Sequence, residues 1–238
     1  MYKNYNVVAV IPARGGSKGV KLKNLRKVNG RSLTELAVRA AKKSIYVDEI
    51  IISSDDQRII NEAERFGAKS LSLRPSSLSK DNSLSADVWR YEWNQAEVSL
   101  KKKFEISVLL EPTCPTRIAI DIDSSIEMLF SKSAGIIVTV SRNPAHFSPQ
   151  KVIVLDDKCN FQFYHSQGVN HSLRQTIPEY FHRNGSCYAS NRTHMIEKNL
   201  FLEQDAKALI IDRLMVNVDT EEDLIYANYL IKKQNFIE

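Results

Sequence analysis

Short runs of valine, isoleucine and leucine recur along the chain, and segments with the three- or four-residue spacing of an amphipathic α-helix separate them. This alternation is typical of βαβ units, whose strands form a mostly parallel sheet covered by helices. The predicted strands are residues 7–11, 49–53, 71–73, 106–110, 135–140, 187–189, 207–211 and 215–218. The predicted helices are residues 32–44, 54–67, 84–100, 121–131 and 220–233. We therefore predict the α/β fold class, with an open and mostly parallel sheet.

Residues 143–183 interrupt this pattern. They are richer in proline, histidine, glutamine, asparagine and aromatic residues, and their hydrophobic periodicity is weak. Two short strands are predicted within them, at residues 151–155 and 160–164. Because the chain of 238 residues has no internal repeat and no low-complexity linker, we predict a single domain, 1–238, from which 143–183 is an inserted excursion.

Composition limits the kinds of partner. The formal charge of +5 and the isoelectric point of about 9.0 suit a small polyanionic substrate, a nucleic acid or simply a lysine-rich surface. We expect no nucleic acid, because no nucleic-acid-binding motif accompanies the charge, and no membrane, because every apolar run is shorter than a membrane span. Three widely spaced cysteines and the lack of a signal-peptide core predict a reducing, cytoplasmic location.

The segment IPARGGSKGVKLKNL, residues 11–25, leads from the first predicted strand into a glycine- and lysine-rich loop. Its GGxxG spacing matches neither the GxGxxG of dinucleotide sites nor the GxxxxGK[ST] of P-loops. A loop at the carboxyl end of a strand is nevertheless where open α/β sheets bind ligands, and the N–H groups of Gly15 and Gly16 suit oxyanions. Three cations stand on the same loop: Arg14, Lys18 and Lys23. The loop predicts a polyphosphate site, with a solvated basic turn as the alternative.

Six segments resemble, in order, motifs of the acylneuraminate cytidylyltransferases, the CMP-sialic acid synthetases and their bacterial nonulosonate relatives. They are IPARGGSKGVKLKNL (11–25), LRPSSLSKDNSLS (73–85), LLEPTCPTR (109–117), SPQKV (148–152), RQTIPEYFHRNGSCY (174–188) and VNVDTEEDL (216–224). The resemblance covers nearly the whole chain. It implies a Rossmann-like sheet of the nucleotide-diphospho-sugar transferase type, with residues 143–183 as a small inserted subdomain that forms a dimer interface and approaches the sugar.

The activity implied by this resemblance is transfer of CMP from CTP to the anomeric hydroxyl of an acidic nine-carbon sugar. Pyrophosphate leaves, Mg²⁺ is required, and the enzyme is a homodimer. Three alternatives stay open: a nucleotidyltransferase of the same fold with another nucleotide or sugar acid, a nucleotide-binding relative that has lost activity, and a nucleic-acid-binding module.

The resemblance also assigns residues by position. Those implied at the CTP site are Arg14, Gly15, Gly16, Ser17, Lys18, Lys23, Asn24, Arg74 and Ser85. Those implied near the sugar are Glu111, Lys151, Arg174, His182, Arg183 and Asn184. Asp219 matches the metal-binding aspartate, and Arg14, Lys23 and Asp219 are the implied catalytic residues. Cations and a metal are what in-line displacement at a triphosphate requires, since the reaction depends on positioning and charge neutralisation.

Three residues depart from the family motifs. Asn217 replaces the first aspartate of the usual D-x-D-T, which removes a charge from the implied metal site. Glu111 replaces a glutamine, which suggests a sugar that offers an amine or hydroxyl, such as a diamino-dideoxy nonulosonate. His182 occupies the usual arginine position beside Arg183, and which of the two reaches the substrate is open. No residue is assigned as the general base.

Asp219 could have a purely structural role instead of binding a metal. Thr220 and Asp223 form a capping-box pattern in front of the last predicted helix. On this interpretation Asp219 simply helps to begin that helix.

Overall fold

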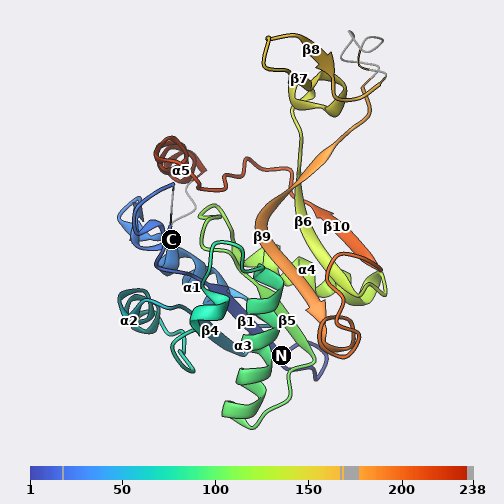
Figure 1. Ribbon diagram of the computed structural model, residues 1–238. Helices are drawn as coiled ribbons and strands as arrows, with labels where there is room; N and C mark the ends of the chain where they lie inside the picture. The colour runs from blue at the N-terminus through green and yellow to red at the C-terminus, as the bar shows by residue number, and fades with distance from the viewer. Residues whose placement is uncertain (18, 167, 169–176, 235–238) are drawn as a thin grey trace.

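The protein is described here from a computed structural model, which covers residues 1–17, 19–166, 168 and 177–234. Its centre is a six-stranded sheet in the order β10-β6-β9-β5-β1-β4 (Figure 1). The strands are β1 (Val7–Pro12), β4 (Glu49–Ser53), β5 (Ile106–Leu109), β6 (Ile136–Arg142), β9 (Phe181–Asn191) and β10 (Ala206–Ile210). β1 runs parallel to β4 and β5, and β10 runs parallel to β6, whereas β9 is antiparallel to both of its neighbours. The predicted open, mostly parallel sheet is confirmed.

Helices cover both faces of this sheet. They are α1 (Leu33–Lys43), α2 (Gln57–Arg65), α3 (Ser85–Leu100) and α4 (Ala119–Ser131). The last helix, α5 (Glu221–Gln234), packs instead in a separate cluster with Val28, Leu33 and Val218. Alternate side chains of β1 point to opposite faces of the sheet. Val7 and Ile11 belong to the core with α1, α2 and α4, whereas Val8 packs with α3. Both sides of β1 are buried, which explains its unbroken apolar sequence.

Short elements complete the fold. The β-structures are the two hairpins β2 (Lys27–Val28) with β3 (Arg31–Ser32) and β7 (Ile153–Leu155) with β8 (Phe161–Phe163). The short helices are η1 (Lys23–Leu25), η2 (Ser76–Leu78), η3 (Ala145–Phe147), η4 (Pro149–Lys151) and η7 (Thr193–Glu197). The predicted cap of α1 is present, because the Ser32 side chain accepts a hydrogen bond from the Glu35 N–H at 2.9 Å.

Between β6 and β9 the chain leaves the sheet, and we call the described residues of this segment, 143–166, 168 and 177–180, the arm. The hairpin of β7 and β8 lies at its far end, held away from the sheet (Figure 1). The arm corresponds to the predicted excursion at 143–183, except that residues 181–183 already belong to β9. Both predicted strands of the excursion are present but shorter than expected.

Two predicted strands are wrong. Residues 71–73 form no strand, and the pairing near them is a single bridge between Ile51 and Lys69. Residues 215–218 run extended without a ladder, and their apolar residues Val216 and Val218 instead pack against α5. Leu73 is 56% exposed and Leu71 only partly buried, so the apolar residues at 71–73 mark neither a strand nor a core segment. At 215–218 the apolar residues are used for burial rather than for pairing, which periodicity alone does not distinguish.

Candidate functional site

A cavity of about 330 Å³, which we call the sheet-edge cavity, opens where β1 and β5 end. Four segments form it: the glycine loop, residues 74–88, the turn after β5 and residues 217–219. Its lining contains these predicted site residues: Arg14, Ser17, Lys23, Asn24, Arg74, Ser85, Glu111 and Asp219. The carboxyl edge of a parallel sheet is the expected place for a ligand in an open α/β fold.

The glycine loop is folded closely against the segment that carries Asp219. A Cβ on Gly19 would lie 2.3 Å from the backbone oxygen of Asp219, so only glycine fits there. The side chain of Asn24 donates a hydrogen bond to the Arg14 carbonyl at 2.9 Å and thereby ties the two ends of the loop together. The Gly15 N–H donates to the Asp55 carboxylate at 2.8 Å, whereas the space around Gly16 is open. Lys18 lies outside the described residues.

Two ion pairs border the cavity. The Lys23 ammonium donates to the Asp219 carboxylate at 2.9 Å and to the Val218 carbonyl at 2.9 Å. Arg14 donates to the Asp81 carboxylate at 2.7 Å. Both carboxylates are at least half exposed, and such pairs contribute at most about 1 kcal/mol. A polyphosphate is therefore able to replace these carboxylates as the partner of Arg14 and Lys23.

The carboxylate of Asp219 does not cap α5. Asp223 accepts hydrogen bonds from the N–H groups of Asp219 and Thr220, both at 2.9 Å, and the Thr220 hydroxyl accepts one from the Asp223 N–H at 3.2 Å. The capping box thus belongs to Thr220 and Asp223. Asp219 contributes only its backbone N–H to this arrangement, and its carboxylate stays beside the cavity.

The oxygen donors around Asp219 determine which metal the site suits. Asp219, Asn217 and Glu111 all line the cavity, although no group of three potential metal ligands occurs among the residues that the structure describes. Mg²⁺ prefers oxygen donors, needs few from the protein and retains water or phosphate oxygens. The donor set therefore fits a hard divalent cation that a bound triphosphate helps to coordinate.

Glu111 lies half-buried at the back of the cavity. Burial raises the pKa of its carboxyl group, while the charges of Arg117, Arg183 and Lys23 oppose that rise. Its Oε2 lies against Gly185, where an added Cβ would come within 2.8 Å and where φ is +71°. The left-handed backbone favours glycine at position 185, and a larger residue there would also displace the Glu111 carboxylate.

Arg74 forms the floor of the cavity on the side of α3. It is only 5% exposed, and its Nη2 donates to the Ser53 carbonyl at 2.6 Å. Burial lowers the pKa of Arg74, while Asp55 and Glu92 counteract that effect. Glu92 is itself buried and accepts a hydrogen bond from the Ser53 hydroxyl at 2.6 Å. Sequence reasoning missed Glu92, although a glutamate between two buried tryptophans of one helix was a usable signal.

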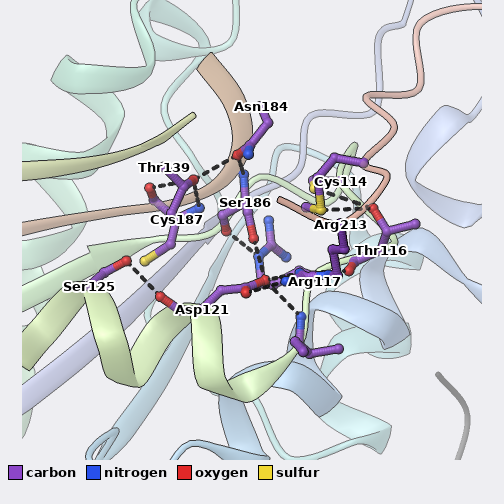
Figure 2. Close-up of polar contacts among 12 residues, drawn as sticks. Cys114, Thr116, Arg117, Asp121, Ser125, Thr139, Asn184, Ser186, Cys187 and Arg213 are labelled. Carbon is purple, nitrogen blue, oxygen red and sulfur yellow. Dashed lines mark hydrogen bonds and ion pairs between the residues drawn. The ribbon is translucent and has the colours of Figure 1, made fainter. Parts of the chain in front are cut away.

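A buried polar network supports the back of the cavity (Figure 2). Arg117 donates through Nη2 to the carbonyls of Glu111, at 2.5 Å, and Gly185, at 3.0 Å, and through Nε to the carbonyl of Ser186. Asp121 accepts from the Ser186 hydroxyl at 2.9 Å and pairs with Arg213. These residues were also missed, because their partners are distant in sequence. The network fixes the Glu111 turn to β9.

The residues predicted near the sugar are dispersed. Lys151, His182, Arg183 and Asn184 are absent from the described lining of the cavity. Lys151 belongs to the arm, and Arg174 lies outside the described residues. Asn184 is 2% exposed, and its side chain bonds internally to Thr139, Ser141 and Ser186.

His182 and Arg183 differ in their surroundings. His182 contacts the Asn143 side chain at 2.6 Å, at the base of the arm. Arg183 is exposed, and its charge acts on the pKa of Glu111. Of the two neighbours, Arg183 therefore has the clearer electrostatic link to the cavity.

Comparison with known proteins identifies the family of the chain. The model of a family described as cytidylyltransferase matches residues 8–234. The chain belongs to the cytidylyltransferase family. It is thus a CTP-dependent nucleotidyltransferase, as the sequence resemblance implied.

Two curated relatives match nearly the whole cytidylyltransferase chain. The N-acylneuraminate cytidylyltransferase of Escherichia coli is 28% identical over 233 residues, which are 96% of this chain and 53% of that protein. The CMP-N,N'-diacetyllegionaminic acid synthase of Campylobacter jejuni is 27% identical over 230 residues, 96% of each chain.

A solved structure shares the fold. The CMP:2-keto-3-deoxy-manno-octonic acid synthetase complexed with CTP superimposes with a TM-score of 0.69 at 18% identity, and the match covers 96% of this chain and 99% of that one. The predicted Rossmann-like nucleotidyltransferase fold is confirmed. In the part of the cytidylyltransferase that the structure describes, no helix is long and apolar enough to span a membrane.

Proposed function

We propose that this cytidylyltransferase transfers CMP from CTP to the anomeric hydroxyl of an acidic nine-carbon sugar. The sugar is sialic acid or a nonulosonate of the legionaminic or pseudaminic type, and the product serves surface glycan synthesis. The observation that carries this proposal is the sheet-edge cavity, which gathers Arg14, Lys23, Arg74 and Asp219 from distant segments. The names of the relatives support the choice of sugar.

The reaction is an in-line displacement at the α-phosphorus of CTP. The anomeric oxygen forms a bond to that phosphorus, the bond to the bridging oxygen breaks, pyrophosphate leaves and the hydroxyl loses its proton. Arg14, Lys23 and the loop residues Gly15, Gly16, Ser17, Lys18 and Asn24 bind the triphosphate. They neutralise the charge that moves to the leaving group. Arg74 and Ser85 bind the cytidine.

We propose Mg²⁺ as the cofactor of this reaction. When bound, the ion supplies further charge neutralisation at the phosphates. Asp219 would hold it, together with phosphate oxygens, and Asn217 offers a neutral amide oxygen where the family has a second carboxylate. Replacing that carboxylate by an amide is expected to weaken metal binding in the absence of nucleotide.

The acceptor sugar is assigned to the Glu111 side of the cavity. Arg183 offers a positive charge to the sugar carboxylate, while Asn184 holds the strand that carries Arg183. Lys151 belongs to the arm and His182 to its base. We propose that these two residues and Arg174 reach a sugar site completed by a second copy of the chain. The exposed apolar side chains of the arm support such a homodimer: Phe147, Ile153, Val154, Leu155, Phe161 and Tyr164. The free thiols of Cys114, Cys159 and Cys187 support a cytoplasmic location.

Glu111 favours a particular class of acceptor. Its carboxyl group is partly desolvated, and an amide or hydroxyl of a diamino-dideoxy nonulosonate would donate a hydrogen bond to it. Plain N-acetylneuraminate provides fewer amide donors. We therefore expect the diamino sugars to give the highest kcat/KM.

A pyrophosphate-release assay tests both parts of the proposal. The protein is mixed with CTP, UTP, ATP or GTP and with N-acetylneuraminate, a legionaminate or a pseudaminate, with Mg²⁺ or with a chelator. CTP with one nonulosonate should be the best pair, and the chelator should abolish turnover. Faster turnover with another nucleotide would assign a different nucleotidyltransferase. CTP binding without turnover on any of these sugars would contradict the proposed reaction, and a preference for N-acetylneuraminate would contradict the role of Glu111.

A further inference from the structure

A second cavity, of about 310 Å³, lies between α1, the start of α4 and α5. We call it the α1–α4 cavity, and it shares no described lining residue with the sheet-edge cavity. One part of its lining is apolar: Leu36, Ala40, Pro115, Ile118, Ala119, Ile120 and Ile231. The rest is cationic: Arg31, Arg39, Lys43 and Arg117. Among the residues that the structure describes, no carboxylate lines it.

One carboxylate lies beside two of the cations that line this cavity. Glu35, next to the cavity, is shared by two guanidinium groups: its Oε1 lies 2.7 Å from Arg39 and 3.8 Å from Arg31. An adjoining hollow of about 400 Å³ shares Arg39 and Lys43 with the α1–α4 cavity and adds the cations Lys42 and Arg65. Neighbouring cations raise the local positive potential, and a concave, partly apolar wall focuses it. The surface therefore favours an anion.

Arg117 provides a second, independent observation. It is 6% exposed, and its hydrogen bonds go to backbone carbonyls rather than to a carboxylate. Its Nη1 is buried without a hydrogen-bond partner among the described residues. Asp121, drawn beside it in Figure 2, is paired with Arg213. A buried donor without a hydrogen-bond partner calls for an explanation.

We propose that the α1–α4 cavity binds a small amphipathic anion, a carboxylate or phosphate attached to a short apolar group. The apolar group packs against the aliphatic lining, and the head group lies among Arg39, Lys43 and Arg117. An occupant there compensates the buried charge of Arg117. Because Arg117 also holds the carbonyls of Glu111 and Gly185, the occupant changes how firmly the Glu111 turn is held. The site is thus coupled to the Glu111 side of the sheet-edge cavity, which we assign to the acceptor sugar.

Hexanoate is a suitable probe, with hexan-1-ol as its neutral counterpart of the same chain length. Isothermal titration calorimetry on the full chain should detect hexanoate at concentrations where hexan-1-ol does not bind. Hexanoate should also raise the Tm by about 2 °C or more, because it binds the folded state only. Saturating CTP should leave hexanoate binding intact. Displacement of hexanoate by CTP would place it in the nucleotide cavity and overturn the proposal, as would equal binding of the alcohol.

Two variants that each introduce one negative charge, one inside the lining and one outside it, locate the site. Ile120 is 59% exposed in the first turn of α4, where a new carboxylate is compatible with the helix dipole. Ile120→Glu should weaken hexanoate binding at least about ten-fold, since it places a negative charge beside the cations. Ile225→Glu makes the same change at a 71% exposed position of α5 outside the lining and should leave binding unchanged. Equal affinities of the two variants would overturn the assignment.

Coupling is tested separately from binding. If the nonulosonate reaction proposed above is present, hexanoate should change the KM for the acceptor sugar in the wild type and in Ile225→Glu, but not in Ile120→Glu. Binding without any change in KM would overturn the coupling through Arg117, but the binding site itself would still be supported. The binding experiments require no turnover, so they decide the site even if the proposed reaction is wrong.

Discussion

The pairing of Lys23 with Asp219 shows how single residues prepare the nucleotide site. One supplies the cation proposed for the triphosphate and the other the carboxylate proposed for the metal, and each neutralises the other at 2.9 Å. A phosphate that binds Lys23 releases Asp219, which is then free to coordinate a cation. Metal and nucleotide binding are therefore expected to assist each other.

Replacing Lys23 tests this arrangement. In Lys23→Ala the leaving pyrophosphate loses one fixed positive charge, so kcat/KM for CTP should fall by about 10²–10³-fold. Lys27→Ala removes an exposed lysine four residues further along and serves as the matched control. The measurement is initial-rate pyrophosphate release at varied CTP. Equal rates for the two variants would exclude Lys23 from the chemistry.

Glu92 gives a prediction about pH. Burial raises the pKa of its carboxyl group, with the Ser53 hydroxyl and Arg74 opposing the rise. The folded state therefore holds the proton to higher pH than the unfolded state, whose carboxyl titrates near 4.3. The contribution of Glu92 to stability is thus lost as the pH rises from about 4.3 through the folded pKa.

Glu92→Gln keeps a hydrogen-bond acceptor for Ser53 but no longer titrates. The stability of the wild type relative to this variant should decline as the pH rises above about 4.3. Urea unfolding at several pH values measures the difference. A difference that grows with pH would mean that the folded pKa is depressed instead.

At the level of elements, periodicity and capping predict most of the fold. The strand from Val7 and the helix capped by Ser32 were predictable because their signals are local. The predicted strand at 215–218 was wrong because burial and pairing leave the same apolar pattern. The one at 71–73 was wrong because two leucines in three residues are too short a signal, and Leu73 is exposed. The lining around Arg14, Lys23 and Asp219 followed from family motifs. The network of Arg117, Asp121 and Arg213 did not, since its partners are brought together only by the sheet order.

At the start of α5 the structure assigns helix capping and the proposed metal binding to different residues, a distinction that the sequence left open. Thr220→Ala removes the hydroxyl that accepts from the Asp223 N–H and should cost about 1 kcal/mol of unfolding free energy, with little change in turnover. Asp219→Asn should do the reverse, leaving stability nearly unchanged and lowering turnover by about 10²-fold or more. Chemical denaturation and pyrophosphate release on both variants test the separation. Loss of activity in Thr220→Ala at full stability would contradict it.

At the scale of the whole molecule, the cytidylyltransferase consists of a sheet with its own cores and an arm whose described residues contribute little to any core. The three hydrophobic clusters among the described residues lie within the sheet, its helices and the α5 segment. The hairpin of β7 and β8 has exposed residues on both strands. An isolated two-stranded hairpin is at best marginally stable in water. This architecture makes the arm dependent on another surface.

In the homodimer proposed above, the arm of a second copy would supply that surface, and oligomeric state is the decisive measurement. The wild type should sediment at twice the chain mass of 27.1 kDa at micromolar concentration. Phe161, 61% exposed on β8, should bury in the interface, and burying such a side chain contributes about 1.5–3 kcal/mol. Phe161→Glu should therefore shift the protein towards the monomer.

The control for this shift is Ile45→Glu, which makes a comparable change at a 72% exposed position outside the arm. It should remain dimeric, and circular dichroism should show both variants folded, because the cores of the sheet do not include the arm. If the sugar site is completed by the partner's arm, monomeric Phe161→Glu should lose affinity for the acceptor while still binding CTP. A wild type that sediments as a monomer would contradict the whole arrangement and would require the sugar to be bound by one chain alone.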